Sequence, residues 1–150
     1  MMAGRFRRGL ALPAAEWWLA IEALVLLAVS RTVLGVLPFR VAMPWLGLRL
    51  QRGAATPEGE GPQAAPIVPL VADAVRRAAT VAPFRAVCLQ QAVAAALMLR
   101  RRGYAAQVHF GVAKDGNGNM IAHAWSRCQG ELVTGGRQMP DYQPISVFVI

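Results

Sequence analysis

The chain has 150 residues and 55% of them are hydrophobic, which is enough for one buried core. Sixteen basic against eight acidic side chains give a net charge of +8, which suits nucleic acid, an anionic membrane surface or an acidic peptide alike. Two cysteines are too few for a disulfide framework, which argues against a small secreted, disulfide-stapled domain and favours the reduced cytoplasm.

The first fifty residues predict helices. Prolines at both ends suit one long apolar helix over residues 13–37, followed by a shorter, interrupted helical piece over residues 39–50. The basic start and apolar run resemble a signal peptide or a membrane anchor, but Glu22 and Arg31 interrupt the run. An ionised side chain at mid-bilayer costs at least about 2.5 kcal/mol. We therefore expect this helix to pack on the core or on a partner, without membrane contact.

Residues 51–66 are rich in Gly, Pro, Ala and Gln and have no periodic apolar face, so they predict a linker. The linker separates an N-terminal helical segment, residues 1–50, from a core over residues 67–150. This core opens with a predicted helix over residues 67–81. Its apolar face consists of residues at helical spacing: Val68, Val71, Val75, and Ala78 or Ala79.

Cys88 stands at the start of the next predicted helix, which runs to Arg102 and is closed by Gly103. The unpaired N–H groups and the positive end of a helix stabilise a thiolate in this position. A lone cysteine in an apolar helix is also commonly a buried small hydrophobe, so position alone leaves the role of Cys88 open.

The sequence after this helix changes to the alternating pattern of strands. Helices followed by a small antiparallel meander make the predicted fold class α+β. The predicted strands cover residues 104–113, 120–128, 131–134 and 145–150, with a hairpin turn at 114–119.

The stretch from Phe84 to Trp125, FRAVCLQQAVAAALMLRRRGYAAQVHFGVAKDGNGNMIAHAW, resembles the core of the lasso-peptide maturation proteases, which are transglutaminase-like leader peptidases. The shared features are a cysteine that opens a helix, an arginine-rich helix end with glycine, a strand ending in Gly-Val, and AHAW. The resemblance implies a transglutaminase-like, papain-like core in which the cysteine helix packs on a small antiparallel sheet. It also implies that Cys88 and His123 are the catalytic pair, as nucleophile and as general base and acid.

The resemblance further implies the reaction, a hydrolysis without a cofactor. The enzyme would remove the leader from a ribosomally made lasso precursor before macrolactam ring closure. Three partners follow: a leader-recognition protein, the precursor, and an ATP-dependent macrolactam synthetase. The chain is too short for a separate leader-binding domain, so we expect the recognition protein in trans, with Trp17, Trp18 and Trp45 near its contact. The arginines lack interleaved aromatic residues, so we expect no nucleic-acid partner.

The alternation of side chains along residues 120–128 argues against a zinc site. It places His123 and Trp125 on one side of their strand and Cys128 on the other. A zinc site made from Cys88, His109, His123 and Cys128 would need both faces at once and has no close-spaced ligand pair, so we expect no metal.

The sequence departs from the family pattern at the third catalytic residue. In the family it is an acid on the strand after the histidine, where it orients the imidazole. A two-residue turn would pair Cys128 with Glu131 and Trp125 with Thr134. That register puts Thr134 on the face of His123 and leaves no carboxylate beside the imidazole.

Two orienting residues are therefore predicted, the hydroxyl of Thr134 or the carboxylate of Asp141 folding back from the tail. Gln90 and Gln91 are open candidates for a side-chain oxyanion donor, besides the backbone N–H of Cys88. The alternative function is a catalytically impaired scaffold of the same fold that binds precursor or synthetase.

Overall fold

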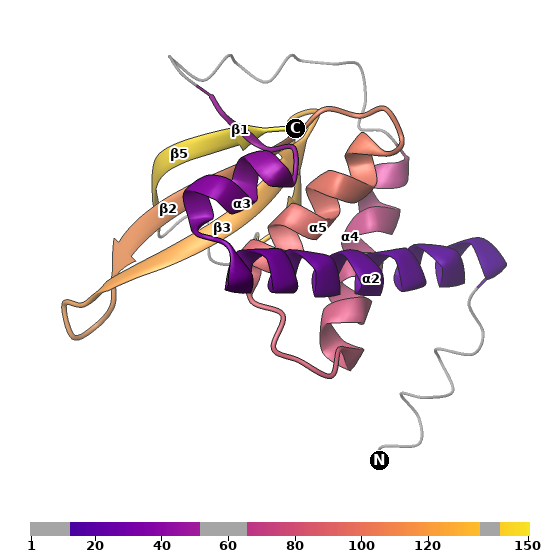
Figure 1. The fold of residues 1–150 in the computed structure, drawn as a ribbon, viewed down its shortest axis with the longest axis horizontal. Coiled ribbons are helices and arrows are strands. Elements are labelled where there is room, and N and C mark those ends of the chain that lie inside the picture. The colour runs from indigo at the N-terminus through magenta and orange to yellow at the C-terminus, as the bar shows by residue number, and fades with distance from the viewer. Residues whose placement is uncertain (1–12, 52–65, 136–141) are drawn as a thin grey trace.

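The computed structural model describes residues 13–51, 66–135 and 142–150. Within these residues, four helices lie on one side of a five-stranded antiparallel sheet, as the predicted α+β class requires (Figure 1). The helices are α2 (Ala14–Val36), α3 (Phe39–Trp45), α4 (Ile67–Val81) and α5 (Cys88–Arg100). The strands are β1 (Arg49–Leu50), β2 (Ala106–Lys114), β3 (Met120–Cys128), β4 (Glu131–Thr134) and β5 (Gln143–Val149).

Helix α2 confirms the predicted long N-terminal helix and packs on α4 and α5. Glu22 binds the guanidinium of Arg102, at the end of α5, through two hydrogen bonds of 3.0 Å and 2.6 Å. This bidentate ion pair raises the pKa of Arg102, chiefly through the hydrogen bonds to Glu22. The charge that interrupts the apolar run therefore ties α2 to the core. The buried face of α2 consists of Leu19, Ala23, Leu27 and Ser30.

The segment after α2 differs in part from its prediction. Residues 39–45 are helical as expected, but Arg49 and Leu50 form a short strand because they pair with β5. Phe39 joins α3 to the sheet through edge contacts with Phe110 at 5.4 Å and Phe148 at 5.7 Å.

Helix α4 has the predicted bounds and buries the predicted face. The predicted linker, residues 51–66, lies outside the described residues except for Gln51 and Pro66. Helix α5 lies at the centre of the helical layer and packs on the sheet, chiefly on β3. It approaches closely because small side chains form much of its buried surface: Ala92, Ala94, Ala95 and Ala96.

The sheet has the order β1-β5-β2-β3-β4. Strands β2, β3 and β4 form the predicted meander, but β5 does not continue it beside β4. It returns to pair with the other edge of β2, from Gln107 opposite Val149 onward. The continuous β2–β3 register, from Ala106 opposite Cys128 onward, fixes which residues share a face.

Candidate active site

Cys88 is the first residue of α5, and its half-buried side chain packs against the hydrophobic core. The backbone N–H groups of the first helical turn have no partner within their own helix, and they present a partial positive charge to the thiol. This is the position that the sequence predicted for Cys88.

The two glutamines that follow Cys88 fix the chain just before it. The Gln90 side-chain oxygen accepts a hydrogen bond of 2.7 Å from the N–H of Val87. The Gln91 side-chain amide donates to the carbonyl of Ala86 at 2.9 Å. Both side chains therefore reach back to the preceding loop, a capping role that differs from the oxyanion role left open for them.

Helix α2 holds the same loop from the other side. The guanidinium of Arg31 donates a hydrogen bond of 2.8 Å to the carbonyl of Arg85 and lies 5.5 Å from the ring centroid of Phe84. Arg31 thus joins α2 to the two residues that open the segment leading to Cys88.

His123 lies in β3, is only 7% exposed, and has its ring fixed on three sides. Nε2 is 2.9 Å from the carbonyl oxygen of Gly135. A carbonyl can only accept a hydrogen bond, so Nε2 carries the proton and Nδ1 of the neutral ring keeps its lone pair. The ring centroid lies 4.9 Å from that of Tyr142 and 6.2 Å from that of Trp125. His123 is therefore oriented as a base that works through Nδ1.

The predicted register between β3 and β4 is correct at the turn and wrong beyond it. Cys128 pairs with Glu131, as expected, but a bulge after this pair places Thr134 opposite Ser126 instead of Trp125. The hydroxyls of Thr134 and Ser126 are hydrogen-bonded at 2.8 Å on the buried, helix-facing side. Thr134 is thus directed away from His123, and the group that contacts the imidazole is the Gly135 carbonyl. Asp141 lies outside the described residues.

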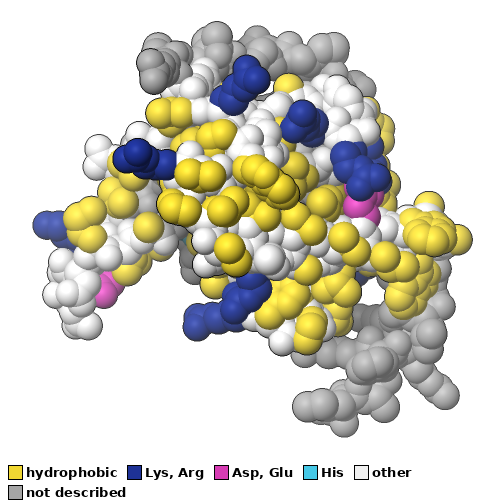
Figure 2. All heavy atoms as spheres, in the orientation of Figure 1, with side chains coloured by type: hydrophobic (Ala, Val, Ile, Leu, Met, Phe, Trp, Pro, Cys, Tyr) yellow, Lys and Arg dark blue, Asp and Glu magenta, His cyan; other side chains and the backbone are white. Residues whose placement is uncertain are grey.

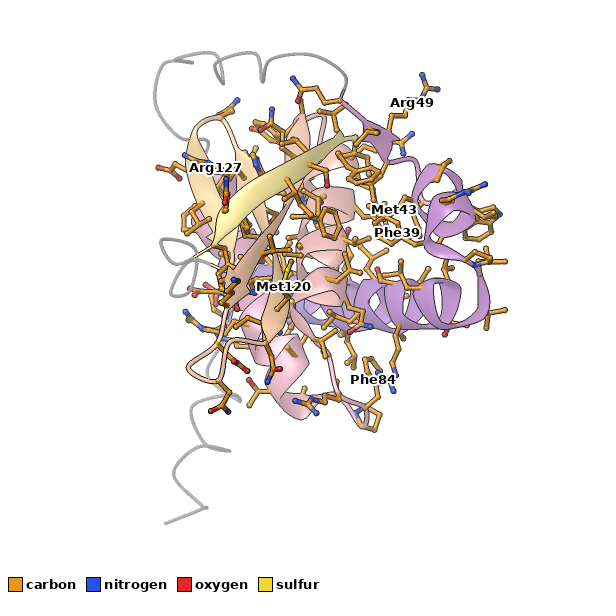
Figure 3. All side chains as sticks on the ribbon, turned by 90° about the vertical axis from the view of Figure 1, so that its left-hand side faces the viewer. Phe39, Met43, Arg49, Phe84, Met120 and Arg127 are labelled. Atoms are coloured by element: carbon orange, nitrogen blue, oxygen red, sulfur yellow. The ribbon has the colours of Figure 1, made fainter. Side chains whose placement is uncertain are left out.

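Strand alternation separates the two faces of β3. Ala124 and Cys128 belong to the core beneath the helices, so His123 and Trp125 point to the opposite face. Figure 3 shows the same alternation, with Arg127 on the side of the sheet away from Phe39 and Met43. Among the described residues no hydrogen bond joins Cys88 to His123. The structure brings their elements together without pairing the thiol and the imidazole.

The C-terminal end of α5 is near the end of β3, because the strand that follows α5 begins at Ala106, which pairs with Cys128. Helix α5 packs on β3, the strand that bears His123.

His109 and Cys128, the other members of the rejected zinc set, lie on opposite faces. His109 stacks on Trp125 with ring centroids 5.5 Å apart, and Cys128 is buried in the core. Burial, and secondly the positive charge of Arg127, lowers the pKa of His109. Within the described part of the chain, no three His, Cys, Asp or Glu side chains gather into a metal-binding set.

Sequence reasoning missed two parts of this site, the Gly135 carbonyl and the ring of Tyr142. A search for acidic side chains cannot find a backbone oxygen. The signal was a glycine directly after β4, which adopts a positive φ of +83°.

Residues 33–147 match the sequence profile of the Transglutaminase-like superfamily. The match spans α3, α4, α5 and the sheet, and therefore includes Cys88 and His123. No curated protein and no solved structure matches the chain.

Proposed function

Because the chain belongs to the Transglutaminase-like superfamily, we propose that it is a cysteine peptidase that removes the leader peptide from a lasso-peptide precursor before macrolactam ring closure. The choice of this substrate rests on the resemblance of residues 84–125 to the lasso-peptide maturation proteases. The observation that supports the chemistry is the position of two side chains. The Cys88 thiol stands at the start of α5, and α5 packs on β3, which bears His123. The carbonyl of Gly135 orients the His123 ring.

The reaction has two steps. Nδ1 of His123 takes the thiol proton as the Cys88 sulfur attacks the carbonyl carbon of the last leader residue, and it passes this proton to the departing amine of the core peptide as the peptide bond breaks. The leader remains as a thioester on Cys88 until water, deprotonated by His123, releases it as a carboxylate. The Cys88 backbone N–H supplies a hydrogen bond to the oxyanion in both steps. The freed amine is the nucleophile that ring closure needs.

Both steps need the thiol close to Nδ1 of His123. Strand β4 pairs with β3 only from Ser126 to Cys128, so no strand covers the β3 edge beside His123 within the described residues. We propose that precursor binding brings Cys88 to Nδ1 around this edge. Catalytic hydrogen bonds of this kind commonly form only in the substrate complex.

We propose the same three partners in the cytoplasm: the precursor, a leader-recognition protein in trans, and the ATP-dependent synthetase that consumes the product. The recognition protein supplies proximity by holding the leader while the active site cuts next to it. The isolated chain should therefore process precursor slowly.

A second candidate function is a scaffold that binds precursor or synthetase without cleaving. Two observations favour it: the thiol and the imidazole are not hydrogen-bonded, and a neutral carbonyl takes the place of an orienting carboxylate. The intact Cys88 and His123 favour the peptidase.

The test is precursor cleavage in the presence of the recognition protein, followed by mass spectrometry of leader and core peptide. Wild type and Cys128→Ala should release both fragments, and Cys88→Ala should release neither. Cys128 is a matched control because its buried thiol faces the helices. Binding of precursor without cleavage by any of the three proteins would replace the peptidase by the scaffold.

A further inference from the structure

Helix α2 exposes an apolar stripe on the side opposite its buried face, interrupted by Thr32, whose hydroxyl is hydrogen-bonded to the carbonyl of Ala28. The stripe residues are between 38% and 75% exposed and recur at intervals of three, four or seven residues. On a helical wheel they all fall within about 80°. We call these residues the α2 stripe: Trp18, Ile21, Val25, Val29 and Val36.

Helix α3 extends this surface with Val41 at 51% exposure and Trp45 at 67%. Figure 2 shows hydrophobic side chains gathered over α2 and α3 on one face of the molecule. Scattered apolar side chains are normal on a protein surface, but an apolar face of this kind marks a contact surface. We call the α2 stripe together with Val41 and Trp45 the apolar face.

The two charges that argued against membrane contact do not lie on the apolar face. Glu22 is turned toward Arg102, and Arg31 toward the carbonyl of Arg85. Their positions on the helical wheel are about 60° and 120° away from Val25, the centre of the stripe. The objection drawn from the sequence therefore applies to a helix that spans the membrane and not to this surface.

Basic side chains border much of the apolar face, as the dark-blue groups above, to the left of and below it in Figure 2 show. The carboxylates of α2, α3 and β1 are Glu16 and Glu22, and each is in an ion pair: Glu16 with Arg77 of α4 at 3.2 Å, and Glu22 with Arg102, just after α5, at 2.6 Å. The rim of the face is thus positive. The exposed arginines of α3, β1 and the end of α5 are Arg40, Arg49, Arg100 and Arg101, of which Arg101 lies 3.5 Å from Glu22.

We propose that the apolar face binds the surface of an anionic phospholipid membrane, which at this face takes the place of the recognition protein expected near Trp18 and Trp45. Exposed tryptophans, an apolar helix lying flat and a border of arginines are the features that favour the interface between lipid and water. A second copy of the chain would bring one arginine rim against another, which disfavours a dimer through this face.

The contact is peripheral. Helix α2 is long and apolar enough to span a bilayer, but its other side holds Leu19 and Leu27 in the protein core. Spanning would require α2 to leave α4 and α5 and to break the Glu22–Arg102 pair. Binding on the surface leaves these contacts intact.

The test is co-sedimentation of the full chain with two kinds of vesicle, phosphatidylcholine mixed with phosphatidylglycerol and phosphatidylcholine alone. We expect binding to the anionic vesicles, weaker binding to the neutral ones, and release by salt, since salt screens the arginine rim. Val25→Glu should weaken binding about tenfold or more, because it places a carboxylate in the middle of the buried area. Val81→Glu is the matched control, since Val81 is 71% exposed at the end of α4.

Each other occupant gives a distinct result that would overturn the proposal. Equal vesicle binding by Val25→Glu, Val81→Glu and wild type would show that the face is not the lipid contact. Binding that only detergent reverses would indicate a spanning α2. A dimer that Val25→Glu dissociates, without vesicle binding, would assign the face to a second copy. Loss of partner-dependent cleavage in Val25→Glu, without vesicle binding by wild type, would assign it to the recognition protein.

Discussion

The Nε2 atom of His123 lies 2.9 Å from the carbonyl oxygen of Gly135, so a backbone group orients the imidazole. A carbonyl fixes the tautomer as a carboxylate would, but it lacks the full negative charge that stabilises an imidazolium. A cysteine nucleophile depends less on that charge than a serine does, since its thiolate forms more readily. We therefore expect an active but slow enzyme.

Gly135→Ala should lower kcat about 10- to 100-fold. A Cβ at this position would lie 2.8 Å from the carbonyl oxygen of Ala124 and 3.0 Å from Nε2 of His123, so the carbonyl and the ring must move apart. Gly103→Ala is the matched control, because Gly103 has nearly the same φ, +82°, and nothing within 4 Å of a Cβ.

Both glycine variants should lose about 1–2 kcal/mol of stability from the positive φ, measured by urea unfolding. Only Gly135→Ala should lose kcat in the cleavage assay. Equal kcat values for the two variants would show that the Gly135 carbonyl does not position the base.

Arg31→Met should slow leader cleavage about tenfold by releasing the loop before Cys88. The variant loses the hydrogen bond to the Arg85 carbonyl and the contact with Phe84. Arg31 acts as a positioning residue. In Arg31→Met the rate at which iodoacetamide alkylates Cys88 should therefore differ from that of wild type, while the melting temperature changes little. Arg31→Lys should restore part of the rate.

Arg76→Met is the control for Arg31→Met. Arg76 is a mostly exposed α4 arginine in an i,i+3 ion pair, which contributes little. The positioning role is wrong if the two Met variants cleave equally fast.

Much of the fold followed from the sequence because it depends on local patterns. The prolines on either side of α2 predict a helix between them, and the apolar spacing of α4 predicts a second helix. The alternation along β3 predicts a strand. The structure has all three elements. The place of β5 next to β2 could not be predicted in this way, since strand order depends on long-range pairing.

The candidate site was less predictable than the fold. The position of Cys88 at the start of its helix is a local property and was correct. The role expected for Thr134 was wrong because one bulged residue in β4 turns this side chain to the other face. In the described part of the chain, the thiol of Cys88 and the imidazole of His123 are not hydrogen-bonded to each other, because Cys88 packs against the core under the helices and His123 points to the other face of β3. This relationship is long-range, so no local sequence pattern encodes it.

Stability should fall as the pH drops below about 6.5. The pKa of His109 is lowered in the folded protein, so in this range the unfolded chain binds more protons than the folded chain. Stability from this group is fully present above the unfolded pKa and is lost as the pH falls toward the folded pKa.

His109→Phe should flatten this pH dependence, because phenylalanine keeps the stacking on Trp125 and does not titrate. The measurement is urea unfolding of wild type and variant at pH 7.5 and pH 5.5, conditions that bracket the ordinary pKa of about 6.5. Parallel stability curves for the two proteins would assign the pH dependence to other groups.

The most direct test of the central claim is the mass of the enzyme during turnover with precursor and recognition protein. Acid-quenched wild type should carry the leader as a thioester on the peptide that contains Cys88, and His123→Ala should carry little of it. Leader release by an enzyme whose Cys88 is never acylated, or equal acylation in wild type and His123→Ala, would contradict a Cys88–His123 peptidase.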